Sequence, residues 1–550
     1  MRVRLPIVLL PLLFSLAAWA VVFTAFPPES QRFPLLDEWA FGPEALDFAR
    51  GAGIHYEGWA SMPQLGQWLW SFPFIAALGP NFFALRLSTI VLGWLGLLAF
   101  HDLLRQLKVP AWQAAFATAA FALNPLFFLM QGTYMTDVPA VSFALIALSL
   151  YGRAFQARDA RYLAPAAVVA ILGGITREHV IAAPLTAGLV LAAIPELRCR
   201  AGWVASVLLP VAVGAGTHFW FVSRPDIQPM PPEMPDLLRL TLTPWFLIHT
   251  LGLATLPVLL LDPWPRSWRR FGIALAAALA IAYFWYKRGD LFVFDGLFPY
   301  TMGVIDPHGV FATNTLVGAT AREDMLSLKW EALLTFLGCV GAAVLIDRLP
   351  SRFRNGDFKL RKGNLLLIFG LFQIIPLFLT RTLYDRYMIF LIPSGLYLAM
   401  GDRAEGAARP WRRIPAAAAL ATFAVVSVSF MHDWFAWNTA RWDVGHRALA
   451  RGINPLDIEG GFEWNGWYGP RPIPKRKEKA KPEGDAIMLN YTAKQFYYVR
   501  GRYALSFSVL KRTVPLDAEP CHLWIQRGTK QIFLVKRLAP ERMIVRAQSP

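Results

Sequence analysis

Long apolar stretches separated by short polar loops run through the chain as far as residue 431. The first stretch, 5–26, carries no charge and is long enough to cross a bilayer as a helix. It is too long for the apolar part of a cleaved signal peptide, and many more stretches follow. A window of about 19 residues predicts about thirteen spans. They lie near 5–26, 82–100, 111–129, 138–155, 162–176, 179–195, 203–222, 243–261, 271–286, 328–346, 364–380, 387–401 and 414–431.

Composition agrees with a polytopic membrane protein, since 55% of the residues are hydrophobic and only 17% are charged. A soluble chain carries about a quarter charged residues. The formal net charge of +17 lies in alternate short loops between spans, as positive-inside topology requires, so no nucleic-acid partner is predicted. This places the N-terminus in the cytoplasm and everything after residue 431 on the opposite face. The basic loops lie at 105–108, 153–161, 198–200, 266–270, 348–362 and 403–413.

Three segments on the extracytoplasmic side are long enough to carry a site. The first loop, 27–81, is rich in tryptophan and proline, and the second, 287–327, mixes charged residues with glycines. The tail shows a helical pattern at 442–450 and strand-like runs at 486–491, 522–526 and 531–535. We therefore predict a mainly α fold in two domains, a transmembrane domain at 1–431 and a small extracytoplasmic α/β domain at 432–550.

Asp37 and Glu38 form an acidic pair about ten residues beyond the first span. Such a pair can hold a cation, accept a proton from a substrate, or stay hydrated in a loop. A metal site has little support. The three cysteines are far apart, and His55 and His308 lack ligand spacing. A divalent metal therefore stays possible but unsupported.

Several further motifs follow the acidic pair in a defined order. They are 83–89 (Phe-Ala-Leu-Arg-Leu-Ser-Thr) at the start of the second span, Asn124-Pro125, 136–139 (Thr-Asp-Val-Pro), Arg177, and 385–387 (Asp-Arg-Tyr). In this order and on this topology, the chain resembles the GT-C membrane glycosyltransferases up to about residue 400. Within that class it is similar to the branch of protein O-mannosyltransferases and lipid A aminoarabinose transferases. One departure is 62–65 (Met-Pro-Gln-Leu), where such proteins often have Pro-Pro or His-Pro-Pro; it puts the acceptor in doubt.

The resemblance implies that sugar is transferred, with inversion, from a polyprenyl-phosphate donor to an envelope acceptor: a lipid, a polysaccharide or a protein. The reaction would occur on the outer face of a bacterial plasma membrane, with the lipid-linked sugar as cosubstrate and no certain cofactor. Asp37 would be the catalytic base and Glu38 a supporting acid. Asp137, Arg177, Arg381, Arg386 and Tyr387 would bind substrate, with arginine suited to the phosphate.

Other roles remain open for these residues. Asp137 also suits the start of a helix, Arg177 can pair with Glu178, and Arg381 and Arg386 can anchor a span at the interface. Two other classes of function are also open. One is a transporter or lipid flippase, although the halves of the chain do not repeat each other. The other is a non-catalytic subunit of envelope assembly.

Overall fold

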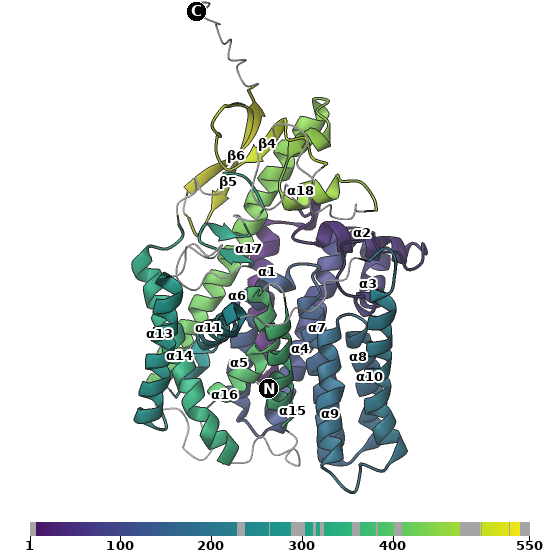
Figure 1. Cartoon of the computed structure of the whole chain (residues 1–550), viewed down its shortest axis with the longest axis vertical. Coiled ribbons are helices and arrows are strands. Elements are labelled where there is room, and N and C mark those ends of the chain that lie inside the picture. Colours follow the sequence, from purple (N-terminus) through teal and green to yellow (C-terminus); the bar gives the residue numbers. More distant parts are fainter. Residues whose placement is uncertain are drawn as a thin grey trace, which may run out of the picture.

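The computed structural model describes residues 7–227, 237–262, 265–287, 303–311, 315–318, 324–354, 364–380, 383–400, 410–472, 496, 498–526 and 528–538. A bundle of helices forms most of the molecule, and a small sheet with short helices covers one end of it (Figure 1). This confirms the mainly α fold with a small C-terminal α/β region. The chain is a multi-pass membrane protein.

Each predicted span lies on one or two helices, because a long apolar run satisfies its backbone in lipid only as a helix. The helix bounds are α1 Leu10–Ala25, α4 Phe82–Gln106, α5 Ala111–Ala122, α6 Pro125–Gln131, α7 Asp137–Ala157, α8 Leu163–Gly174, α9 Ala182–Ala192, α10 Ala201–Val222, α11 Leu237–Ala254, α12 Leu256–Leu259, α13 Trp268–Lys287, α14 Leu328–Arg354, α15 Leu365–Leu379, α16 Ile392–Ala399 and α17 Arg413–Ala450.

Within the described residues, six helices are long and apolar enough to cross a membrane, namely Ile7–Ala25, α4, α7, α10, Leu328–Arg352 and α17. A seventh span results if α5 and α6 count as one, bent by 63° at Asn124-Pro125. Asn124 caps α6 there by accepting a hydrogen bond from the amide of Leu126 at 3.1 Å. Five further apolar helices have 10–17 residues. The number thirteen therefore stays a prediction, although every predicted segment is helical.

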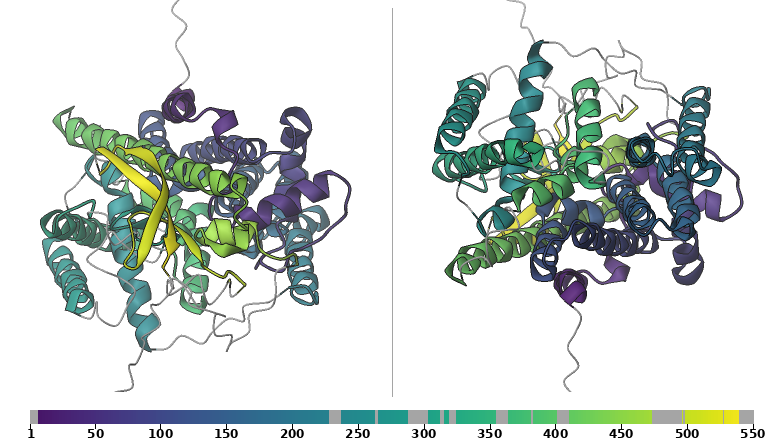
Figure 2. Two further views of the ribbon diagram at one scale, coloured as in Figure 1. Left: turned by 90° about the horizontal axis from the view of Figure 1, so that it is seen from above. Right: turned by 90° about the horizontal axis from the view of Figure 1, so that it is seen from below.

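The covered end of the bundle is built from the first loop, the second loop and the tail (Figure 1). The first loop contributes α2 (Glu38–Ala49) and the apolar helix α3 (Leu65–Leu78). The second contributes a short antiparallel pair, β1 (Ile305–Asp306) with β2 (Gly309–Val310). The tail contributes α18 (Phe462–Trp467) and a sheet of order β3-β4-β6-β5. Seen from above, the sheet lies over α17, and α18 lies beside α2 (Figure 2, left).

The sheet consists of β3 (Ile458–Glu459), β4 (Tyr503–Ser506), β5 (Thr513–Leu523) and β6 (Gly528–Arg537), with only the β3–β4 pair parallel. The predicted strand at 531–535 lies inside β6, and the helix predicted at 442–450 is the end of α17. The predicted strand at 522–526 is wrong in extent, because β5 ends at Leu523 and a turn follows. The run 486–491 lies outside the described residues. α17 continues through residue 431, the expected domain boundary.

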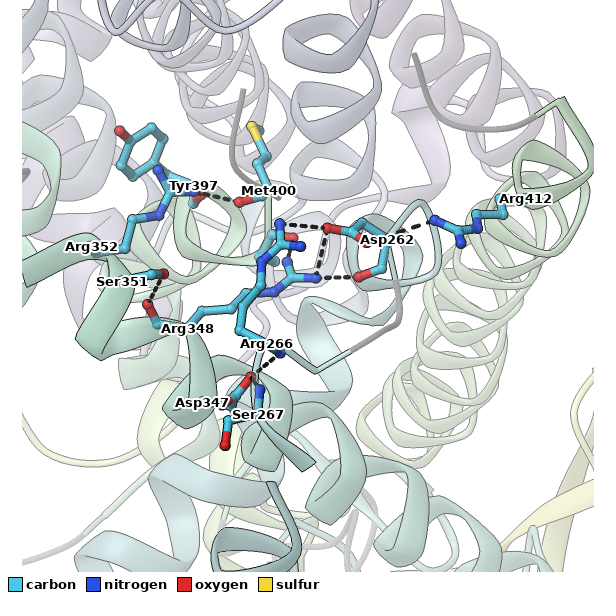
Figure 3. A network of polar contacts seen from close by, with 11 residues as sticks. Asp262, Arg266, Ser267, Asp347, Arg348, Ser351, Arg352, Tyr397, Met400 and Arg412 are labelled. Carbon is cyan, nitrogen blue, oxygen red and sulfur yellow. Dashed lines mark hydrogen bonds and ion pairs between the residues drawn. The ribbon is translucent and has the colours of Figure 1, made fainter. Parts of the chain in front are cut away.

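Basic side chains tie several helices together through the residues shown in Figure 3. Arg348 of α14 donates to the carbonyl oxygens of Asp262 and Ala399, so it links α14 to the segment after α12 and to the end of α16. The carboxylate of Asp262 lies 3.2 Å from Arg266 and 3.7 Å from Arg412. Arginines from the predicted cytoplasmic loops therefore also join α12, α14, α16 and the start of α17.

Candidate functional site

Asp37 stands at the N-terminus of α2, where the first loop turns over the end of the bundle. Its Oδ1 accepts a 2.7 Å hydrogen bond from the indole of Trp59, and its Oδ2 lies 3.9 Å from Arg386. Burial raises the pKa of the Asp37 carboxyl above its ordinary value. Arg386 and the Trp59 hydrogen bond oppose that rise, and the nearby Asp137 carboxylate adds to it. A carboxylate whose pKa is raised toward neutrality is a better general base.

Arg386 lies between two acids that are far apart in the sequence. Its Nε is 3.8 Å from Oδ2 of Asp137, and an Nη is 3.9 Å from Oδ2 of Asp37. Both distances exceed hydrogen-bond length. Nε of Arg386 and Oδ2 of Asp137 are buried and make no hydrogen bond within the described residues. Arg386 thus offers a donor at a place where an anionic oxygen would satisfy it.

Asp137 and Arg177 form a buried ion pair beside this arginine. Asp137 begins α7, and its Oδ1 accepts a 2.7 Å hydrogen bond from Arg177, which also donates to Thr136 at 3.1 Å. The Arg177 guanidinium lies over the ring of Tyr387, 5.5 Å from its centroid. The ion-pair partner of Arg177 is therefore Asp137, whereas Glu178 lies 4.0 Å from His179.

Glu38 is buried and fully engaged. Its two oxygens accept hydrogen bonds from Arg86 at 3.1 and 2.6 Å, and they also accept from the backbone amides of Tyr134 (2.6 Å) and Leu35 (2.8 Å). Each oxygen already accepts two hydrogen bonds, so neither is free for a substrate hydroxyl, and the geometry favours the supporting role. Arg86, within the 83–89 motif, was not singled out from the sequence. An arginine inside a predicted span was the available signal.

Five of the seven candidate residues come together here: Asp37, Asp137, Arg177, Arg386 and Tyr387. Glu38 accepts a hydrogen bond from the Leu35 amide in the turn before Asp37. Arg381 lies outside the described residues. Trp59 also belongs to the site, through its hydrogen bond to Asp37, and it was not predicted. The loop contains several tryptophans, and the sequence does not indicate which of them contacts the acid. Among the described residues, no group of three or more histidine, cysteine, aspartate or glutamate side chains is placed to hold a metal ion.

An open groove of about 420 Å³ lies between the first loop and α10. Ile54 and Leu65 line one side of it, and Val213, Thr217 and Trp220 line the other. None of the residues that line it belongs to the site. We therefore take the polar cluster around Arg386, and not this groove, as the candidate site.

Comparisons with known proteins give a structural similarity only. No model of a known protein family matches the chain, and no curated protein matches it. Among solved structures, ArnT from Cupriavidus metallidurans bound to undecaprenyl phosphate is similar at 14% identity and a TM-score of 0.38. That match covers 95% of this chain and 97% of ArnT. The Archaeoglobus fulgidus oligosaccharyltransferase is similar at 14% identity and a TM-score of 0.42, over 90% of this chain and 64% of that one.

Both solved proteins belong to the GT-C class that the sequence resembles. Similarity at this level says nothing of activity, so the function has to come from the site itself.

Proposed function

We propose that this chain is an integral-membrane glycosyltransferase that moves a sugar from a polyprenyl-phosphate donor to an acceptor in the cell envelope. The observation that carries the proposal is Arg386, which lies between Asp37 and Asp137 with donor capacity unused. The neighbouring Arg177 already makes hydrogen bonds of 2.7 and 3.1 Å to Asp137 and Thr136. Neither acid lies within hydrogen-bond distance of Arg386, which favours Arg386 as the contact for a donor phosphate.

In this mechanism Oδ2 of Asp37 takes the proton of the acceptor hydroxyl while that oxygen bonds to the anomeric carbon. The bond from the anomeric carbon to the phosphate oxygen breaks, and the polyprenyl phosphate leaves with the electron pair. Attack opposite the leaving group inverts the anomeric centre. Because charge grows on the phosphate, the guanidinium of Arg386 stabilises the transition state more than the bound donor. The hydrogen bond from Trp59 occupies Oδ1 and leaves Oδ2 for the proton.

The position of the site supports a lipid-linked donor. Asp37 lies in the loop that follows α1, at the end of the bundle that the tail covers (Figure 1). A head group at that level reaches the polar cluster while its hydrocarbon tail stays among the helices. We place the reaction on the outer face of a bacterial plasma membrane, with the N-terminus in the cytoplasm and the tail outside. The acceptor is a lipid, polysaccharide or protein hydroxyl.

The test is a transfer assay with the purified protein in liposomes, with a polyprenyl-phosphate sugar as donor and a nucleotide sugar as the comparison. Transfer from the lipid donor only, and a loss of about 10²–10⁴-fold in Asp37→Asn, is the expected result. Asp47→Asn is the matched control. It lies in the same helix, is 43% exposed, and pairs with Arg50 on the surface.

Three outcomes would contradict the proposal: efficient use of the nucleotide sugar, a normal rate in Asp37→Asn, or movement of the lipid donor across the bilayer without sugar transfer. The last would identify a flippase.

A further inference from the structure

The turn before Asp37 is held by two glutamates from opposite ends of the chain. Leu36 has φ +52°, a left-handed conformation that a leucine seldom adopts. The amide of Leu35 donates to Glu38 at 2.8 Å, and the amide of Leu36 donates to Glu463 at 3.1 Å. Two consecutive backbone amides are thus each fixed by a buried carboxylate.

Glu463 belongs to α18 of the tail and is completely buried. Its other oxygen accepts a 2.9 Å hydrogen bond from Arg441 of α17, which is also completely buried. The Arg441 guanidinium lies over the rings of Trp437 and Trp442, at 5.1 and 5.7 Å. Arg441 therefore fixes the Glu463 carboxylate against α17. Through its hydrogen bond to the Leu36 amide, that carboxylate in turn fixes the backbone next to Asp37.

The same segment also touches α2 just beyond Asp37. Gly466 packs so closely that a Cβ there would lie 2.3 Å from the Trp39 ring. Arg471 donates to the carbonyl oxygen of Trp39 at 2.8 Å. The tail thus contacts the chain one residue before and two residues after the proposed base.

We propose that Glu463 is a positioning residue for Asp37. It fixes the left-handed turn at Leu36 so that the Asp37 carboxylate faces both Trp59 and Arg386. This inference rests on the proposed function, because it assigns the tail a part in the transfer reaction. A 1 Å displacement of a reacting group is enough to cost about 10²-fold in rate.

The test compares two double variants. Arg441→Met/Glu463→Leu removes the buried pair without leaving an unpaired charge, and it deprives the Leu36 amide of its acceptor. Arg447→Met/Glu519→Leu removes another arginine–glutamate contact between α17 and the tail, 2.7 Å long and partly exposed. We expect the first variant to lose about 10²-fold in kcat with an unchanged KM for the donor. The acid limb of its kcat–pH profile should move to higher pH, because Asp37 loses the partners that lower its pKa. The second variant should match the wild type.

Arg441→Met/Glu463→Gln supplies the rescue, since its carboxamide oxygen can accept from Leu36 without the charge. It should recover most of the lost rate. A wild-type kcat and pH profile in Arg441→Met/Glu463→Leu would overturn the proposal. Should that variant not fold, Glu463→Asp withdraws the oxygen from Leu36 by one methylene and is judged on the same two measurements.

Hydrogen exchange of the peptide covering 33–41 separates this proposal from the proposed function. Faster exchange in Arg441→Met/Glu463→Leu than in Arg447→Met/Glu519→Leu is expected whatever the reaction is. If the wild type transfers no sugar while this difference appears, the proposed function fails and the hold on the turn stands. If the wild type transfers sugar and neither exchange nor kcat changes in the variant, Glu463 does not position Asp37.

Discussion

Trp59 donates a 2.7 Å hydrogen bond from its indole Nε1 to Oδ1 of Asp37, across 22 residues of the first loop. The Trp59 ring is itself held between aromatic neighbours, 5.0 Å from Trp39 and 5.7 Å from Phe462. The tryptophan therefore fixes which oxygen of Asp37 points toward Arg386.

Replacing Trp59 with phenylalanine should shift the pH dependence of sugar transfer. The hydrogen bond lowers the pKa of Asp37 against the effect of burial, so its loss raises that pKa further. The base is then protonated at a higher pH, and the acid limb of the kcat/KM profile moves to higher pH. Trp70→Phe is the control, since Trp70 donates to the Ser88 carbonyl instead. An identical profile in both variants would mean that Asp37 is not the titrating base.

Arg386→Ala should raise the KM for the lipid donor and also lower kcat, because in the proposed mechanism the arginine contacts a phosphate whose charge grows during the reaction. If Arg386 holds the donor phosphate as proposed, we expect a loss of about 10²–10³-fold in kcat, the usual effect of removing one charge-stabilising donor. Lysine at this position should rescue only partly, because a point charge does not reproduce a planar guanidinium. Steady-state kinetics in liposomes would measure both constants, with Arg50→Ala as the surface control. A change in neither constant would leave the phosphate without its proposed partner.

Glu38→Gln should destabilise the fold more than it alters chemistry. The substitution leaves the buried Arg86 without its counter-charge, and breaking a buried ion pair costs about 3–5 kcal/mol. Thermal unfolding in detergent should show a clear drop in Tm, whereas Asp47→Asn at an exposed pair should cost about 1 kcal/mol or less. An unchanged Tm together with lost transfer would instead make Glu38 a direct participant in the reaction.

Glu44 of α2 should make stability depend on pH. Burial raises the pKa of its carboxyl to about 8 from 4.5, and the neighbouring Glu57 carboxylate adds to the rise while the Glu57 amide opposes it. Because the folded pKa is the higher one, the protonated form stabilises the fold. This contribution is complete below about pH 4.5 and is lost as the pH rises toward about 8. Glu44→Gln should flatten this part of the Tm profile between pH 5 and 9. If the Tm of Glu44→Gln changed with pH in the same way as that of the wild type, Glu44 would not be the source of this pH dependence.

Cysteine labelling should place Asp37, Asp306 and Trp464 outside the cytoplasm and Arg354 inside. The reason is that basic loops stay on the cytoplasmic side. Single cysteines at these four positions, labelled in intact cells and in inverted vesicles, give the measurement. Cytoplasmic labelling at Trp464 would require an even number of spans and would remove the proposed outer site.

The hydrophobic pattern predicted the helices well because apolar length alone decides a span. The pattern did not predict α3 as an element within the first loop. This helix, Leu65–Leu78, has only 14 residues, which are too few to cross a bilayer. The boundary expected at 431 falls inside α17, whose 38 residues run on from the bundle into the covered end. Nothing in the local sequence marks where such a helix leaves the bundle.

For the site, ordered motifs were enough to bring Asp37, Asp137 and Arg386 together, and their catalytic roles stay predictions. Two of the supporting partners could not be found in this way. Glu38 meets Arg86 across 48 residues, and Leu36 meets Glu463 across 427. Contacts between such distant segments depend on how the helices pack, and neither a motif nor a period in the sequence records them.

The separation between Leu36 and Glu463 also has a consequence in time. The acidic turn emerges early in synthesis, and 427 residues must be added before its second glutamate exists. At about 5–20 residues per second, synthesis of the segment between Leu36 and Glu463 takes roughly 20–85 s, and the Leu36 amide lacks its acceptor during that time. A ribosome that stalls before Glu463 leaves helices already inserted in the membrane but no finished turn. With Glu463 in its proposed role, full activity appears only in chains whose translation has passed that codon, and a chain that stops before it would transfer sugar about 10²-fold more slowly.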